Sequence, residues 1–164
     1  VRYSGSRVMR GYLATADTPF GPVPVRIGLG SSDSREATLA HEIGHLLDGF
    51  AVDPASRFYF ASHDVTGPAA GWIASVQQSR AFTALIDWAN GSPPPGQPRR
   101  PTAWFQYLLE PHELFARAYA QYIAVRSGDA VLVRQIADAR ARHPYAQWDD
   151  GDFTPVADAL DDLF

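Results

Sequence analysis

The alternation of apolar and polar residues near the N-terminus predicts a short β-strand. Val23, Val25 and Ile27 alternate with proline, arginine and glycine, which is the period of a half-buried strand. Pro24 cannot donate a backbone hydrogen bond, so this strand is expected at the edge of a sheet. Residues 1–30 as a whole are predicted to be extended.

A helix is predicted next, from Ser31–Ser34 to Leu47 or Asp48. The serines are good N-cap residues, and Gly49 is a typical helix terminator. Apolar residues recur at helical spacing and form one stripe, which consists of Leu39, Ile43, Leu46, Leu47 and Phe50. The polar residues on the opposite side of this helix include two histidines.

The remaining pattern predicts further helices joined by loops. Residues 51–70 and the proline-rich run Ser92–Pro98 are expected to be irregular. Helices are predicted over about 70–90, from Pro111 to Arg126, over about 129–142, and from Thr154-Pro155 towards the end of the chain. A short apolar segment, Trp104–Leu109, precedes the helix that starts at Pro111. The pattern therefore predicts a helix-rich α+β fold with a small N-terminal sheet.

The composition fits one compact domain and limits its chemistry. The chain has 164 residues, of which 46% are hydrophobic, so residues 1–164 are expected to form a single domain with its own core. The chain starts at Val1 rather than Met, which suggests that the domain was cut from a longer protein. Cysteine is absent, which excludes disulfides, thiolate catalysis and cysteine-bound metal. Any metal ion must therefore be bound by histidine, glutamate or aspartate.

Charge and hydropathy argue against two classes of partner. The net charge is −4 and no run of basic residues occurs, so nucleic acid is not an expected partner. No apolar stretch approaches the length that spans a membrane, and the N-terminus lacks the apolar part of a signal peptide, so a membrane is not expected either. All 14 basic residues are arginine, which indicates a GC-rich bacterial or phage genome.

The sequence His41-Glu42-Ile43-Gly44-His45 lies in the middle of the first predicted helix. Residues four apart lie on one face of a helix, so the two imidazoles can bind the same metal ion. Glu42 is offset by about 100° round the helix axis, where it can reach a metal-bound water more easily than the metal. This is the spacing of HExxH metallopeptidases, in which zinc activates a water and the glutamate takes its proton. The alternative is a surface helix that happens to carry two histidines.

A catalytic zinc ion needs a third protein ligand, which must come from further along the chain. The candidates are Asp48, Asp53, His63, Asp64, Glu110, His112 and Glu113. Glu113 is favoured, because it lies off the apolar stripe of its helix and because the chain holds few glutamates. The residues on its side are small, namely Ala116, Ala120 and Ala124, which allows a second helix to approach closely. The alternative is an ion pair between Glu113 and Arg117 on a solvated face.

Two blocks of sequence together resemble a known group of metallopeptidases. His-Glu-Ile-Gly-His-Leu-Leu-Asp, followed later by Glu-Leu-Phe-Ala-Arg-Ala-Tyr, is similar to the gluzincins, and among them to the anthrax lethal factor-type metallopeptidases. The likeness covers roughly residues 23–50 and 104–125. It implies a zincin-like fold and one zinc ion, and the residues that it assigns are His41, His45 and Glu113 as ligands and Glu42 as general base.

The resemblance also implies a tyrosine that faces the metal shortly before the glutamate ligand. Tyr107 is the best match, and its hydroxyl can donate a hydrogen bond to the oxyanion of the reaction. The alternative for Tyr107 is a place in the core. The closing segment, Gln147–Pro155, is similar to the tails of phage head-morphogenesis and polymorphic-toxin proteins.

Other polar residues have weaker assignments. Asp48 lies on the side of the ligands and is predicted to orient one ligand imidazole by accepting its free N–H. His63 and His112 are candidates for polarising a substrate, with a solvated histidine as the alternative for each. The acidic clusters 149–152 and 158–162 are predicted to be solvated surface.

Together these residues predict a zinc-dependent endopeptidase that hydrolyses peptide bonds in a protein or peptide substrate. One alternative is a non-catalytic zinc-binding module of a phage or toxin assembly. Another is a zinc enzyme of a different kind, such as an amidase or a protease that cuts only its own parent chain. The intact Glu42 favours catalysis, since a degenerate site tends to lose its base first.

Overall fold

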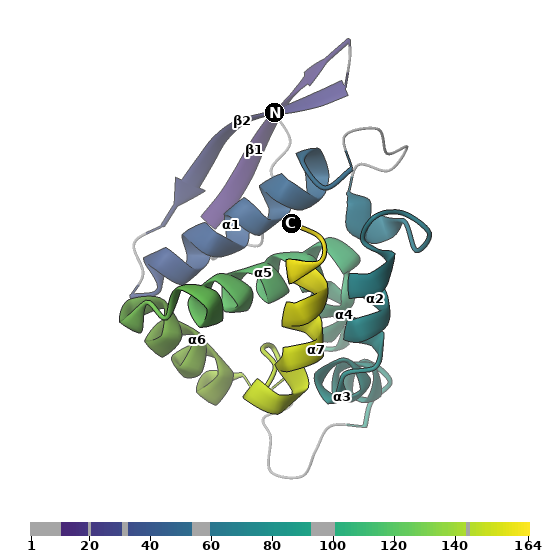
Figure 1. Cartoon of the computed structure of the whole chain (residues 1–164), viewed down its shortest axis with the longest axis vertical. Helices are drawn as coiled ribbons and strands as arrows, with labels where there is room; N and C mark the ends of the chain where they lie inside the picture. The colour runs from purple at the N-terminus through teal and green to yellow at the C-terminus, as the bar shows by residue number, and fades with distance from the viewer. Residues whose placement is uncertain (1–10, 20, 31–32, 54–59, 93–100, 144) are drawn as a thin grey trace.

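The computed structural model of the chain describes residues 11–19, 21–30, 33–53, 60–92, 101–143 and 145–164 (Figure 1). The elements in that part are β1 (Gly11–Thr18), β2 (Gly21–Leu29), α1 (Arg35–Phe50), the 3-10 turn η1 (Ala61–His63), α2 (Ala70–Gln77), α3 (Arg80–Ala89), α4 (Thr102–Leu109), α5 (Pro111–Ser127), α6 (Ala130–Arg142) and α7 (Asp150–Asp161). The predicted α+β class, helix-rich with a small N-terminal sheet, is therefore confirmed. None of these helices is long and apolar enough to cross a membrane.

The antiparallel hairpin of β1 and β2 lies along α1 (Figure 1). Its register begins with Gly11 opposite Leu29, and Leu13 is one of the buried residues of β1. The predicted strand forms part of β2, but Val23 and Val25 are 42% and 56% exposed, so the expected half burial is wrong for both. The buried residues of the hairpin are Leu13 and Ala14 of the partner strand, β1, and this strand contacts α1.

The ends of α1 lie close to the predicted positions. Ser34 is the N-cap, as expected, although its side chain makes no capping hydrogen bond. The helix continues through Gly49 to Phe50, so the predicted end before Gly49 is wrong. A glycine typically ends a helix by adopting a left-handed backbone, which Gly49 does not do. Gly128 does adopt it, with a φ of 64°, and there α5 ends.

The polar face of α1 is the face that turns inward. Glu42 and His45 are buried, whereas Leu39 of the apolar stripe is 39% exposed. The helix packed on this face is α5, and Gly44 lies so close to it that a Cβ there would stand 2.7 Å from the Cα of Ala116. The prediction that a second helix approaches the small residues of α5 closely is thus confirmed, and that helix is α1.

The middle of the chain departs from the prediction in two places. The helix expected over 70–90 is divided into α2 and α3, because the chain turns at Ser79, whose side chain caps α3. Trp104–Leu109, expected only as an apolar segment, belongs to the helix α4. Pro111 is the first residue of α5, as predicted. The loop Ser92–Pro98 lies almost entirely outside the described residues.

A hydrophobic core joins α2, α3, α4, α5 and α7. Its largest fully buried side chains include Trp148, Phe115, Phe153 and Leu85. The side-chain amide of Gln121 on α5 accepts from the backbone N–H of Trp148 at 3.1 Å and donates to its carbonyl at 2.9 Å. Helix α5 is therefore held on one side by this core and on the other by α1, which fixes the position of its first turn.

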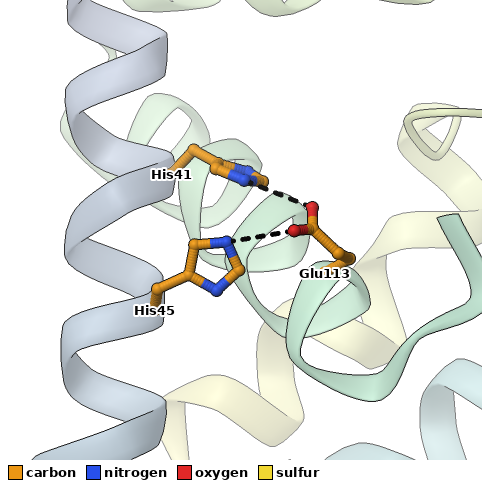
Figure 2. Close-up of side chains that lie close together, drawn as sticks. All are labelled: His41, His45 and Glu113. Atoms are coloured by element: carbon orange, nitrogen blue, oxygen red, sulfur yellow. Dashed lines mark ion pairs between the residues drawn. The ribbon is translucent and has the colours of Figure 1, made fainter. Parts of the chain in front are cut away.

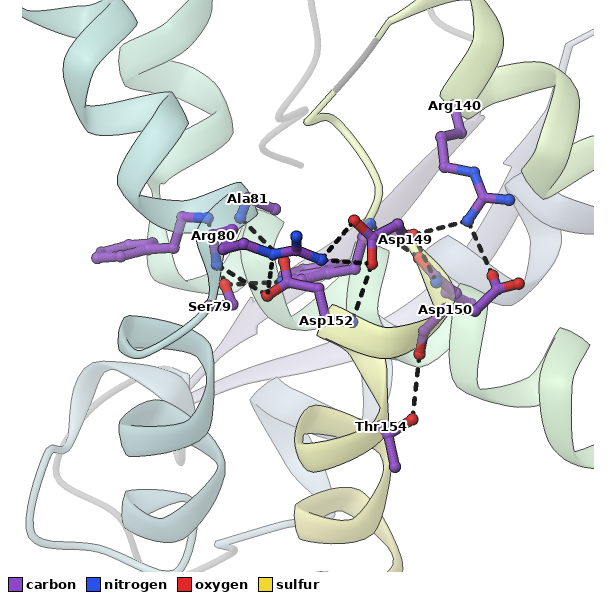
Figure 3. Close-up of polar contacts among 11 residues, drawn as sticks. Ser79, Arg80, Ala81, Arg140, Asp149, Asp150, Asp152 and Thr154 are labelled. Carbon is purple, nitrogen blue, oxygen red and sulfur yellow. Dashed lines mark hydrogen bonds and ion pairs between the residues drawn. The ribbon is translucent and has the colours of Figure 1, made fainter.

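Helix α7 begins at Asp150, so the predicted start at Thr154-Pro155 is wrong. Its N-cap is Asp149, whose carboxylate accepts a hydrogen bond from the N–H of Asp152 at 2.9 Å. The carboxylate of Asp152 in turn accepts from the backbone N–H groups of Arg80 and of the next residue, at 2.8 and 3.0 Å (Figure 3). These contacts join the starts of α3 and α7. The expectation of a solvated surface is therefore wrong for Asp152, whose side chain is 9% exposed.

Candidate metal centre

His41, His45 and Glu113 meet between α1 and α5 (Figure 2). The two histidines lie one turn apart on α1, and Glu113 lies in the first turn of α5. Nε2 of His41 is 3.5 Å from Oε2 of Glu113, and Nε2 of His45 is 3.4 Å from Oε1. One possible ligand atom of each residue lies within 4.8 Å of those of the other two. The fold thus brings the three predicted ligands together.

Two of the three separations between these atoms, those from each imidazole to Glu113, suit ligands arranged round one cation. A tetrahedral zinc ion with bonds of about 2.0–2.2 Å places its ligand atoms roughly 3.3–3.6 Å apart. A direct hydrogen bond between nitrogen and oxygen is shorter, typically about 2.9 Å. The distances of 3.5 and 3.4 Å match the edges of such a tetrahedron better than they match hydrogen bonds.

Glu113 is a buried anion, with only 5% of the residue exposed. Burial by itself raises its pKa, but the neighbouring imidazoles of His41 and His45 outweigh burial and hold the pKa of Glu113 below its usual range. The first turn of a helix also favours a negative charge, because unpaired N–H groups point outward there. Glu113 can therefore bind a cation without first losing a proton.

A solvated ion pair between Glu113 and Arg117, the alternative considered for these residues, is wrong. Arg117 is also only 5% exposed. Its guanidinium donates hydrogen bonds to the backbone carbonyls of Leu108 and Ala146. Arg117 therefore ties α5 to α4 and to the segment before α7, and it leaves the Glu113 carboxylate to the histidines.

Glu42 lies beside the three ligands and is turned towards the hairpin. The residue is 6% exposed, and its carboxylate accepts a hydrogen bond from the backbone N–H of Leu13 in β1. Burial raises the pKa of Glu42 to about 7; the nearby His45 lowers this pKa and Glu113 raises it. Among the described residues, the group that could hold a metal ion does not include Glu42, which leaves its carboxylate for another role.

Tyr107 reaches Glu113 from α4. Although 49% of the residue is exposed, its hydroxyl end is turned inward. Burial raises the pKa of Tyr107, and the negative charge of Glu113 and a hydrogen bond with its carboxylate raise it further. The structure therefore places Tyr107 at the candidate centre and not in the core.

Asp48 is buried, but it does not orient an imidazole. Its carboxylate accepts hydrogen bonds from the backbone N–H and from the hydroxyl of Ser62, both at 2.7 Å. Nδ1 of His45 is buried and has no hydrogen-bond partner within the described part of the chain. The predicted role of Asp48 as acceptor of a ligand N–H is therefore wrong, and Asp48 instead fixes η1 to α1. Burial raises the pKa of Asp48 to about 6, against the hydrogen bonds from Ser62.

A second group of rings lies next to the ligands. Nε2 of His112 is 4.0 Å from Oε1 of Glu113. The His112 ring stacks on Phe60 with centroids 4.8 Å apart, and its Nδ1 is 3.3 Å from Nε2 of His63. Burial lowers the pKa of His112 to about 4, against the charge of Glu113. Sequence reasoning missed Phe60, because a single aromatic residue in a loop forms no pattern.

Two other carboxylates considered as the third ligand, those of Asp64 and Glu110, do not belong to the group that could hold a metal ion in the described part of the chain. Asp64 accepts hydrogen bonds from the N–H and hydroxyl of Thr66, and Glu110 is exposed at the start of α5. Where the structure describes the chain, the one group of residues that could hold a metal ion is His41, His45 and Glu113. Two imidazole nitrogens and a carboxylate oxygen suit zinc and other divalent first-row metal ions.

Comparison with known proteins does not place the chain in a family. The likeness to the lethal factor-type metallopeptidases, and the zincin-like fold that this likeness implies, remain predictions that are based on two blocks of sequence. The same holds for the likeness of the closing segment to phage and toxin proteins. The chain matches no family profile, no curated protein and no solved structure.

Proposed function

We propose that the chain is a zinc-dependent endopeptidase with a zincin-like fold. The observation that supports this most strongly is the meeting of His41, His45 and Glu113 with nitrogen–oxygen distances of 3.4–3.5 Å. Three protein ligands leave one position of a tetrahedral zinc ion open, which is the arrangement of catalytic sites, whereas structural zinc sites use four. The lack of cysteine agrees with such an open site.

Each neighbouring residue then has a role in hydrolysis. His41, His45 and Glu113 would hold the zinc ion, which would supply polarisation of the scissile carbonyl and an attacking water with its pKa lowered to about 7. Glu42 takes a proton from that water and passes it to the leaving amine. Leu13 holds the Glu42 carboxylate in place through its backbone N–H. The hydroxyl of Tyr107 donates a hydrogen bond to the carbonyl oxygen as negative charge develops there.

The proposal is tested by zinc content together with peptide cleavage. Protein purified from zinc-supplemented medium should contain about one zinc ion per chain, and it should cleave members of a mixed peptide library analysed by mass spectrometry. Glu42→Gln should keep its zinc and lose cleavage by at least about 100-fold, because the general base is removed. The same substitution at the exposed Glu110 is the matched control and should change neither quantity.

Two results would contradict the proposal. One is a purified chain that takes up no zinc. The other is a Glu42→Gln variant that cleaves peptides as fast as the unaltered chain, since a general base contributes at least about 100-fold.

A non-catalytic zinc module is the second candidate, and the burial of Glu42 is the observation that favours it. Glu42 is 6% exposed, and a buried carboxylate that accepts from the N–H of Leu13 can serve to attach β1 to α1. In that case the chain binds zinc and cleaves no peptide, and Glu42→Gln lowers thermal stability. The same two measurements, with a melting curve added, distinguish the candidates.

A further inference from the structure

Two aromatic rings contact His112 beside the candidate centre. The centroid of His112 is 4.8 Å from that of Phe60 and 5.6 Å from that of His63, with ring planes inclined by 14° and 27°. Phe60 and His63 belong to the segment round η1, whereas His112 is the second residue of α5. Contacts with two rings of the η1 segment therefore fix the plane of the His112 ring.

The contact between the two imidazoles limits where His112 carries a proton. Nε2 of His63 is 3.3 Å from Nδ1 of His112, which allows one hydrogen bond. If His63 is the donor, a neutral His112 carries its proton on Nε2. If His112 is the donor, its Nε2 presents a lone pair to Oε1 of Glu113, 4.0 Å away. The negative charge of Glu113 disfavours this second case, so Nε2 of His112 is an N–H donor.

His112 lies next to the three ligands without belonging to them. In the described part of the chain, the group whose ligand atoms all lie within 4.8 Å of one another contains His41, His45 and Glu113 but not His112. The His112 side chain is 23% exposed, so a bound molecule can reach it. Its ring centroid is 5.6 Å from that of His45. A donor at this place can contact an oxygen atom bound at the open position of the centre.

We propose that His112 is a further catalytic residue and that His63 is its positioning residue. His112 donates a hydrogen bond from Nε2 to the oxygen of the scissile carbonyl as that oxygen gains negative charge. His63 donates to Nδ1 and so keeps the proton of His112 on Nε2. No covalent bond to either histidine forms or breaks. The inference rests on the proposed endopeptidase function, because it requires a peptide at the centre.

The first test compares His112→Phe with His112→Gln in the zinc-loaded chain. Phenylalanine keeps a ring against Phe60 but removes the donor, so kcat should fall about 100-fold, with KM and the zinc dissociation constant within about threefold. Glutamine carries an amide donor and should recover part of kcat. His143→Phe, a histidine away from the centre, is the control and should leave kcat unchanged. A kcat of His112→Phe within about threefold of the unaltered chain overturns the proposal, as does a tenfold loss of zinc affinity, which would make His112 a ligand.

The second test concerns His63 and measures the position of the proton directly. Long-range 1H–15N spectra of the imidazole rings should assign the proton of His112 to Nε2 in the unaltered chain. In His63→Phe part of that proton should move to Nδ1, with kcat about tenfold lower, and His63→Gln should restore both. A proton on Nδ1 of His112 in the unaltered chain would refute the assignment of His63 as donor.

The third test separates failure of this inference from failure of the proposed function. Acetohydroxamic acid carries a carbonyl oxygen to a zinc centre without being cleaved, and its affinity for the zinc-loaded chain is measured by calorimetry. His112→Phe should bind it about tenfold more weakly at unchanged zinc affinity. If the chain cleaves no peptide, the endopeptidase proposal fails, and this measurement still decides whether His112 is a donor. Equal hydroxamate affinity in both proteins overturns the inference.

Discussion

Gly44 of α1 lies against Ala116 of α5 so closely that a Cβ atom at Gly44 would stand 2.7 Å from the Cα of Ala116. Gly44 directly precedes His45, and Ala116 lies one turn after Glu113. The separation of the two helices at this contact therefore sets the distance between the imidazoles and the carboxylate. A small residue on each helix is what allows that distance to be short.

Gly44→Ala should weaken both the fold and the metal centre. The added methyl group meets backbone atoms of α5, which cannot move aside alone, so we expect a loss of stability of about 1–3 kcal/mol. Zinc affinity should fall at least about tenfold as the helices separate. Gly71→Ala in α2 is the matched control, since a Cβ there would point into open space with no other described segment packed against it. Chemical denaturation and chelator competition measure the two effects, and equal behaviour of the variants would contradict the role of the contact.

Glu113→Gln should lower zinc affinity at least about 100-fold, because a neutral amide replaces a buried anionic ligand. This loss should exceed the loss of affinity expected when a residue that only orients a ligand is changed. Glu110→Gln, three residues earlier and exposed, should leave the affinity unchanged. Titration with a competing chelator measures both. A Glu113→Gln variant that binds zinc as tightly as the unaltered chain would show that another group completes the site.

Asp48 should make the metal-free chain less stable as the pH rises from about 4 to 6. Burial raises its pKa from 3.8 to about 6, so the folded state holds this proton more tightly than the unfolded state. The stabilising contribution is therefore fully present below pH 3.8 and is lost as the pH rises through about 6. The loss is on the order of 3 kcal/mol.

The variant Asp48→Asn isolates this effect, because asparagine keeps an acceptor for Ser62 but does not titrate. The free energy of unfolding of Asp48→Asn relative to the unaltered chain should increase between pH 4 and pH 7, with chelator present throughout. Urea denaturation at each pH gives the difference. Parallel stability curves for the two proteins would mean that Asp48 keeps an ordinary pKa in the folded chain.

Tyr107→Phe should lower kcat about 100-fold with little change in zinc affinity, because it removes a hydrogen-bond donor to the developing oxyanion and keeps the ring. Tyr122→Phe is the control: its hydroxyl donates to Asp161 at the surface, and its loss should leave kcat unchanged. Steady-state kinetics on the best library peptide measure both. Equal rates for the two variants would leave Tyr107 as a surface residue that only touches Glu113.

Much of the candidate centre could be predicted from local sequence. The spacing of His41 and His45 places both imidazoles on one face of any helix, because the helical period is independent of the surroundings. The small residues beside Glu113 indicated a face that admits a second helix, and Gly44 lies against that face. Pro111 marked the start of α5 through its missing N–H.

Other features depend on contacts between distant segments. The carboxylate of Asp48 binds Ser62, Asp152 caps α3, and His63 meets His112, although no local pattern links the members of each pair. The face of α1 that turns inward was also decided by packing, since the polar side found anionic and small partners on α5 and the apolar stripe stayed partly exposed. Helical periodicity and capping involve residues within about one turn of each other, so the sequence alone shows which residues share a helix face and where a helix begins. The burial of a charge depends on which surfaces dock and which partners they supply, and only the folded chain determines that.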